Sequence, residues 1–275
     1  MTDDLRPDAL NRAAWSVDAT VRAFGESEGW TDLGESFAMF RVAPEMAGKP
    51  ILDIGVGAGR TTPLLRNISD DYVAIDFTPA MVDICRSRYP DVRVEFGDAR
   101  DLANFSNASF SLVNFSFCGI DAVNHSDRQL ILKEVHRVLK PGGIFLFSTH
   151  NQLGPGHGEK PWTVRLSDVK HPDRLRDLVT SARQNVENYR RGRRLHEDHG
   201  DWSMMTAMAH NFGIVIHYST IDRQLVELAD HGFEANPEVY ENATGRLVAP
   251  GDDTRGAWWF HLIARKGQPD QLAKA

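Results

Sequence analysis

A glycine-rich turn directly follows a short apolar segment, and this pairing constrains the fold more than any other feature of the 275 residues. Residues 50–55 are typical of a buried strand, and the chain then continues through Gly57 and Gly59 to Arg60. Glycines permit positive backbone torsions and carry no side chain, so a ligand can contact the main chain there. Ligands of open α/β sheets bind at the carboxyl ends of the strands. The turn therefore predicts a ligand site at the end of the first strand of such a sheet.

Strand and helix patterns alternate along the following hundred residues, which favours a parallel sheet with helices on both faces. Helices are predicted over residues 61–68, over a segment that begins with Thr78 as its N-cap, and over residues 127–139. A later helix is predicted after residue 219. The further strands are predicted over residues 72–76, 92–96, 110–117, 144–148, 238–241 and 258–265.

The alternation covers only part of the chain, which divides it into four segments. Residues 1–49 predict two or three short helices and end at a Gly-Lys-Pro break. Residues 50–150 form the alternating core. Residues 151–218 interrupt the alternation with a Gly- and Pro-rich loop, a polar helix over residues 166–195 and a strand over residues 212–218, and residues 219–275 complete the sheet.

Two acids follow the turn at informative positions. Asp76 ends the second strand, where its carboxylate can accept both hydroxyls of a ribose, and Asp98 ends the third strand, where it can accept the exocyclic amine of adenine. A nicotinamide-binding turn carries glycine or alanine at its sixth position, where this chain has Arg60. The pattern therefore predicts an adenosine across three strand ends, with no feature dedicated to a pyrophosphate.

Four stretches, residues 52–59, 73–76, 97–99 and 139–143, resemble the class I S-adenosylmethionine-dependent methyltransferases in order and spacing. The resemblance implies a Rossmann-like fold with a seven-stranded, mostly parallel sheet, and S-adenosylmethionine as the cofactor with S-adenosylhomocysteine as its product. It also implies that residues 1–49 form a helical lid and residues 151–218 an inserted substrate cap. Ser111 departs from the family pattern, in which many members carry Asp at the start of the fourth strand.

The resemblance assigns cofactor contacts along the core. It implies that the turn glycines lie against the methionyl part and the ribose, with Asp53 beneath the turn, Asp76 on the ribose hydroxyls and the strand-four end facing the amino-acid end. Phe77 would flank the adenine, and Asp98 and the Ala99 amide would read its edge. We also interpret Trp30 as a lid contact, with core packing as the alternative. The implied contacts are Asp53, Gly55, Gly57, Gly59, Asp76, Phe77, Asp98, Ala99, Phe115, Ser116 and Trp30.

Methyl transfer is an in-line displacement, so the protein chiefly aligns the reacting groups and needs a base only if the nucleophile arrives protonated. The loops after strands four and five should face the sulfonium. We rank His150 first as base or orienting group, because a neutral imidazole titrates in the useful range, and then Asp121 and His125. The alternative for each is a loop or capping residue. His196 and His199 lack further ligands at metal-site spacing, so no metal is predicted.

The composition narrows the class of protein. The formal net charge of −7 argues against bulk attraction to nucleic acid or anionic membrane. Two cysteines suit a reducing cytosol, and no apolar run approaches the ~20 residues of a membrane helix. We therefore expect a cytoplasmic enzyme that methylates an oxygen or nitrogen of a small molecule, with its oligomeric state open. A basic cluster at residues 190–194 keeps RNA or tRNA methylation as an alternative, beside an alkyl transferase and a non-catalytic cofactor-binding protein.

Overall fold

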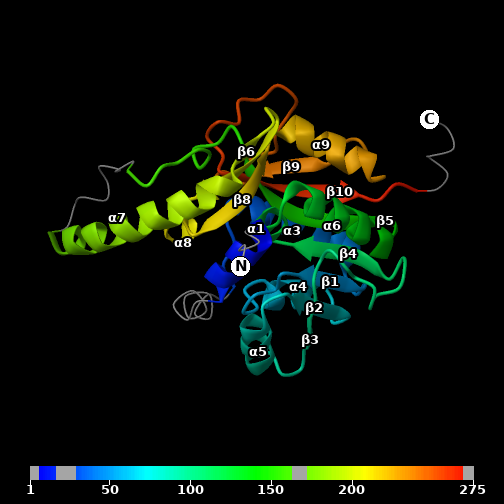
Figure 1. The fold of residues 1–275 in the computed structure, drawn as a ribbon. Coiled ribbons are helices and arrows are strands. Elements are labelled where there is room, and N and C mark those ends of the chain that lie inside the picture. Colours follow the sequence, from blue (N-terminus) through cyan, green and yellow to red (C-terminus); the bar gives the residue numbers. More distant parts are fainter. Residues whose placement is uncertain (1–5, 17–28, 163–171, 269–275) are drawn as a thin grey trace.

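The computed structural model describes residues 6–16, 29–162 and 172–268, and the statements below concern these residues. A central twisted sheet carries the fold, with helices packed on both sides (Figure 1). The first five strands in the order β3-β2-β1-β4-β5 are parallel, and β10 joins β5 in the antiparallel direction with β9 beyond it. These strands are β1 (Ile51–Ile54), β2 (Tyr72–Asp76), β3 (Arg93–Phe96), β4 (Phe110–Phe115), β5 (Leu139–Asn151), β9 (Glu238–Glu241) and β10 (Trp259–Arg265).

Two apolar layers hold helices against this sheet. One layer contains the buried faces of α6 and α9, and the other contains those of α3, α4 and α5. Burial of these side chains at about 25 cal/mol per Å² is what stabilises the two layers. The predicted mostly parallel α/β sheet with helices on both faces is therefore confirmed. The helices are α1 (Pro7–Trp15), α3 (Leu33–Met46), α4 (Thr62–Ile68), α5 (Pro79–Arg88), α6 (His125–Val138) and α9 (Ile221–Asp230), with a 3-10 turn η1 (Gly119–Ala122).

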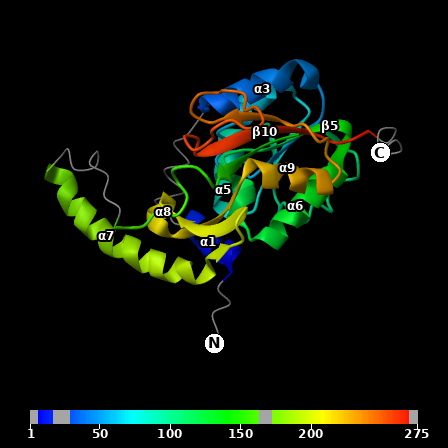
Figure 2. The same cartoon turned by 90° about the horizontal axis from the view of Figure 1, so that it is seen from above.

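The sheet extends further than the sequence predicts. β8 (Ile214–Ser219) pairs in parallel with the last residues of β5, at His150 and Asn151, and β7 (Trp202–Ala207) and β6 (Glu197–Asp198) continue outward in antiparallel order. Of this extension only β8 is anticipated, as a strand over residues 212–218. The long helix α7 (Pro172–Gly192) leaves the body of the molecule, followed by η3 (Arg193–Leu195) and α8 (Ala209–Phe212) (Figure 2).

Two local expectations need correction. The fifth strand runs from Leu139 to Asn151 instead of over residues 144–148, because the turn before it also bonds to its neighbours and its last residues pair with β10 and with the strand over residues 214–219. Thr78 stands at the N-cap of α5, but its side chain makes no capping hydrogen bond, and its backbone N–H donates to Asp76 instead. In the described part of the chain, no helix combines the length and apolarity that a bilayer-spanning segment requires.

Helix α1 lies across the junction of core and extension. Its Asn11 is buried, and its amide donates to the carbonyls of Ala122 and Val215 at 2.7 Å while its oxygen accepts from the Val215 N–H at 2.9 Å. These bonds complete the backbone of β8 on one side and η1 on the other. The amino-terminal segment is thereby attached to both halves of the molecule.

Candidate functional site

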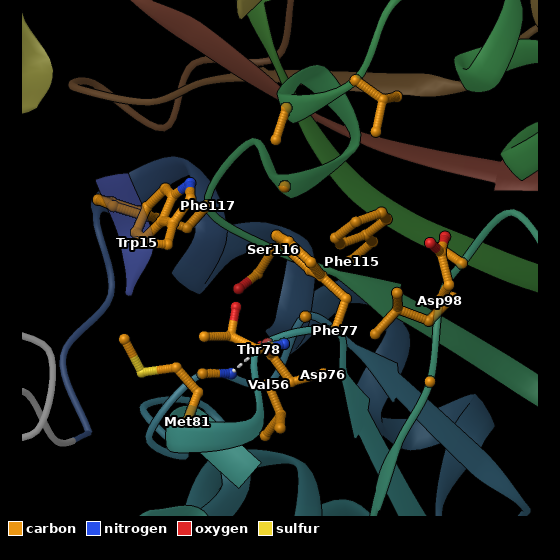
Figure 3. A pocket seen from close by; sticks show the side chains of 18 of the residues that line it. Trp15, Val56, Asp76, Phe77, Thr78, Met81, Asp98, Phe115, Ser116 and Phe117 are labelled. Atoms are coloured by element: carbon orange, nitrogen blue, oxygen red, sulfur yellow. Dashed lines mark hydrogen bonds between the residues drawn. The ribbon is translucent and has the colours of Figure 1, made fainter. Parts of the chain in front are cut away.

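A pocket opens above the carboxyl ends of β1, β2, β3 and β4, the place that the glycine turn predicts (Figure 3). Trp15 of α1 and Asp98 stand at opposite sides of it, and Phe115, Ser116 and Phe117 come from the end of β4. The pocket lining includes eight residues of the expected cofactor set: Gly55, Gly57, Asp76, Phe77, Asp98, Ala99, Phe115 and Ser116. It leaves Asp53, Gly59 and Trp30 outside that lining, each for a physical reason described below.

The turn glycines serve different purposes. Gly57 has φ +57°, and a Cβ built on it would meet no atom within 4 Å, so its missing side chain leaves the pocket floor open. Gly59 has φ +89°, and a Cβ there would lie 2.5 Å from the ring of Tyr89. Gly59 therefore permits close packing against α5 and does not face the pocket, contrary to its expected contact with the cofactor.

Asp76 joins the second strand to the turn. Its Oδ2 accepts from the Gly57 N–H and its Oδ1 from the Thr78 N–H, each at 2.8 Å. Burial raises the pKa of this carboxyl above its ordinary value, although the two amides oppose the shift. A carboxylate has about four acceptor sites, so two remain for hydroxyl groups in the pocket.

Asp98 holds a salt bridge that the sequence reasoning missed. Its carboxylate receives the guanidinium of Arg100, with Nη2 2.7 Å from Oδ2. Burial alone would raise the pKa of Asp98, but the hydrogen bonds from Arg100 outweigh it and the pKa lies below the ordinary value. Arg100 also reaches Asp8 of α1 and Asp127 of α6. This end of the pocket is therefore closed by a charged network that includes the amino-terminal helix.

Asp53 lies entirely beneath the turn. It accepts hydrogen bonds from Asn114 at 2.7 Å, from the Tyr72 hydroxyl at 2.7 Å and from Thr61 at 3.2 Å. Burial raises its pKa to about 6, with these donors opposing the shift. Asp53 thus orders the turn from below and is shielded from the pocket.

Arg60, which the sequence reasoning used only against a nicotinamide site, is part of the pocket wall. Its guanidinium pairs with Glu35 of α3 through two contacts of 2.7 and 2.8 Å, and Nη2 also donates to Ser116 Oγ at 2.8 Å. The same group lies over the rings of Trp30 and Phe117. Trp30 therefore stands behind Arg60, beside the pocket and 43% exposed.

The three catalytic candidates lie outside the pocket lining, in two groups. Asp121 and His150 meet directly: Asp121 Oδ2 accepts from the His150 backbone N–H at 2.7 Å and lies 2.8 Å from His150 Nδ1. Asp121 is fully buried and also pairs with Arg128, whereas the His150 side chain is 24% exposed. A carboxylate on Nδ1 fixes the tautomer that carries its proton there, leaving Nε2 as an acceptor.

His125 belongs to a different cluster. Its Nδ1 lies 3.1 Å from Nε2 of His217, and its ring stacks on Trp202 at 4.0 Å. Burial lowers the pKa of both imidazoles, and Arg128 and Arg223 lower that of His217 further. Glu227 completes a set with metal-ligand spacing, but both arginines already contact it and their positive field opposes a cation.

The backbone between the pocket and His150 is strained. Phe117 and Cys118 both have positive φ, +52° and +57°, which non-glycine residues rarely adopt. The conformation turns the Phe117 ring toward Trp30 and Trp259, with centroids 5.5 and 6.1 Å away. Trp259 in turn lies 6.3 Å from the His150 ring. A continuous row of rings thus connects the pocket to the Asp121–His150 pair.

Comparisons with known proteins agree with this geometry. Residues 51–143 match the family model described as a methyltransferase domain. A probable S-adenosylmethionine-dependent methyltransferase of Mycolicibacterium smegmatis is 29% identical over 189 residues, 68% of this chain and 70% of that protein. A demethylmenaquinone methyltransferase of Renibacterium salmoninarum is 30% identical over 157 residues, 56% of this chain and 60% of its own length. Further curated relatives are matched over about half of their length.

Solved structures share the fold. The 1,6-didemethyltoxoflavin-N1-methyltransferase of Burkholderia thailandensis, solved with 1,6-didemethyltoxoflavin and S-adenosylhomocysteine bound, superimposes with a TM-score of 0.57. The superposition covers 94% of this chain and 88% of that one, at 14% sequence identity.

Proposed function

We propose that this chain is a class I S-adenosylmethionine-dependent methyltransferase and that it methylates an oxygen or nitrogen atom of a small molecule with His150 as the base. The observation that carries the proposal is the Asp121–His150 pair at the end of β5, one ring beyond the pocket wall formed by Phe117. A base in that place would act on an acceptor rather than on the adenosine.

The pocket residues fit S-adenosylmethionine, the cofactor of this family. Asp76 offers acceptors for ribose hydroxyls, Phe77 a flat ring, and Gly57 an open floor. When bound, the cofactor supplies an electrophilic methyl group on a sulfonium. Arg60 also lines the pocket, where its guanidinium is paired with Glu35 and donates to Ser116 Oγ, so it forms a fixed part of the wall.

The chain's own residues would then manage the acceptor and its proton. Asp121 holds His150 Nδ1, so Nε2 is the atom that receives a proton from a hydroxyl or amine. Arg128 is fully buried and pairs with Asp121 and Glu227, which holds the carboxylate of Asp121 in position. The side chains of Phe117 and Trp259 lie between the pocket and the imidazole.

Small-molecule acceptors are favoured over RNA by the distribution of charge. The basic residues Arg190, Arg191, Arg193 and Arg194 are exposed at the carboxyl-terminal end of α7 and on η3, while the pocket is lined by acids as well as arginines. The named acceptor of the Renibacterium relative, demethylmenaquinone, is also a small molecule.

The proposal is tested by separating binding from turnover. Calorimetry should detect S-adenosylhomocysteine binding and no heat with NAD. An acceptor screen that detects released S-adenosylhomocysteine then provides the assay. With an acceptor so found, His150→Gln should lower kcat by about 10²–10⁴-fold, the range for a lost general base, and leave S-adenosylhomocysteine affinity unchanged.

Asp121→Asn should act in the same direction because it removes the orienting carboxylate, and His199→Gln, on the outer extension, is the matched control. Full turnover in His150→Gln would exclude this imidazole as the base. Cofactor binding without turnover on any acceptor would instead favour a non-catalytic binding protein. Methylation of tRNA together with salt-sensitive tRNA binding would favour the RNA alternative.

A further inference from the structure

The register of three strands places aromatic side chains around His150. His150 of β5 pairs with Tyr218 of β8 on one side and with Trp259 of β10 on the other. Directly paired residues in neighbouring strands project from the same face of a sheet. The ring centroids lie 5.4 Å from Tyr218 and 6.3 Å from Trp259. The imidazole is therefore the middle member of a row of rings.

Other side chains complete both ends of this row. Phe117 lies beside Trp259 and also lines the cofactor pocket. At the far end, His157 packs on Tyr218 with ring centroids 5.2 Å apart, and its Nε2 lies 2.9 Å from Ser203 Oγ. The row thus extends from Phe117 in the wall of the cofactor pocket to His157 in the loop at the start of residues 151–218.

The charged groups next to the row are already paired. Asp32 accepts from Trp259 Nε1 at 2.9 Å and contacts His261, which fixes the edge of the indole. Asp121 is neutralised by Arg128, and Arg60 by Glu35. Phe117 remains 38% exposed and the His150 side chain 24%. Phe117 and His150 thus expose ring surface beside the ion pairs of Asp121 and Arg60.

We infer that the methyl acceptor is a planar aromatic or heteroaromatic molecule whose ring carries the reacting hydroxyl or N–H. Its ring would pack against Trp259 and Phe117, with the reacting group toward His150 Nε2. Aromatic pairs favour edge-to-face and offset geometries beyond simple area burial, which a saturated ring of equal size does not obtain. This inference rests on the methyl transfer proposed above and specifies its acceptor class.

Ligand binding tests the inference without knowledge of the natural acceptor. Protein saturated with S-adenosylhomocysteine is titrated calorimetrically with 2-naphthol and 7-hydroxyquinoline, and with decahydro-2-naphthol as the saturated counterpart. We expect both planar probes to bind about tenfold more tightly than the saturated one. Trp259→Leu should reduce that preference to about threefold or less. Trp162→Leu, an exposed ring that packs on Tyr189 of α7, is the matched control and should retain it.

Phe117→Leu provides a second variant if Trp259→Leu does not fold, as judged by S-adenosylhomocysteine binding, and it should reduce the preference in the same way. Equal affinity for planar and saturated probes would overturn the acceptor class, and so would no binding of the planar probes to protein that binds S-adenosylhomocysteine. An equal loss in Trp162→Leu would also overturn it. Absence of S-adenosylhomocysteine binding would overturn the methyl-transfer proposal itself, and the acceptor class with it.

Discussion

In the proposed site Asp76 has two tasks at once, because the carboxylate that we assign to the ribose hydroxyls also accepts hydrogen bonds from the amides of Gly57 and Thr78. Its removal should therefore affect the ligand more than the fold, since the turn is separately ordered from below by Asp53.

Asp76→Ala should weaken S-adenosylhomocysteine binding by about tenfold or more, equivalent to about 1.4 kcal/mol, because buried hydroxyls lose their acceptor. Calorimetric titration measures this effect. Asp83→Ala, an exposed acid on α5, is the control and should bind like the wild type. Equal affinity in Asp76→Ala would remove this residue from the ribose site.

The buried carboxyl of Asp53 should make the free energy of unfolding decrease as the pH rises. Burial raises its pKa in the folded state to about 6, so the folded protein takes up a proton more readily than the unfolded chain. The resulting stabilisation is fully present below the ordinary value of 3.8 and is lost as the pH rises through about 6. Relative to Asp53→Asn, the wild type should thus gain about 2 kcal/mol of unfolding free energy between pH 7 and pH 4.5.

Urea unfolding of both proteins at several pH values measures this difference, in which the other titrating groups largely cancel. A constant difference across the range would show that the Asp53 carboxyl keeps an ordinary pKa.

At the scale of single residues, the pocket residues that could be predicted from the sequence are those that directly follow the end of a strand. Asp76, Asp98 and the turn follow from spacing along the chain, because parallel strands bring their ends to one edge. It missed Arg100 and the α1 residues Asp8 and Arg12, which line the same pocket. Their position depends on the docking of α1, which no local pattern encodes.

Among the elements, α3 is connected to the turn by a buried ion pair. Glu35 of α3 is 3% exposed and Arg60 at the end of the turn 8%. Removal of one partner leaves an uncompensated buried charge, which is far more costly than the loss of a surface pair. The helix and the pocket wall are therefore stabilised together.

Glu35→Gln should lower the free energy of unfolding by about 3–5 kcal/mol. Glu45→Gln on the same helix breaks an exposed pair with Arg265 and should cost less than about 1 kcal/mol. Urea denaturation compares the two variants. Similar small losses in both would mean that water reaches the guanidinium of Arg60.

The elements themselves were predictable to different extents. Strands β1, β2 and β4 are buried along their whole length and appear in the sequence as apolar runs. β7 was not anticipated because its sequence, from Trp202 to Ala207, mixes polar and apolar residues. It becomes a strand through its pairing with β8, a tertiary cause that a local pattern does not contain.

For the whole molecule, the attachment of α1 decides whether the pocket keeps its outer wall. Asn11→Ala removes all three hydrogen bonds from α1 to Ala122 and Val215 and leaves buried backbone groups without partners. We expect faster hydrogen exchange in α1 and about tenfold weaker S-adenosylhomocysteine binding, because Asp8, Arg12 and Trp15 line the pocket from this helix.

Hydrogen-exchange mass spectrometry and calorimetry check this expectation. Asn188→Ala on α7 loses a hydrogen bond to Asn211, remote from the pocket lining, and should change neither quantity. Unaltered exchange in Asn11→Ala would show that other contacts suffice to hold α1 in place.

The end of β5 is the point where β8 joins the sheet, and the imidazole of His150 stands at that seam. The glycine turn proposed to bind the cofactor is built from residues 55–60, whereas Tyr218, which lies beside His150, and His157, which packs on Tyr218, come from residues 151–218. If the acceptor binds beside His150 as proposed, exchange of residues 151–218 between related chains should change which acceptor is used and leave the proposed cofactor site intact, which makes this segment a target for engineering a new specificity.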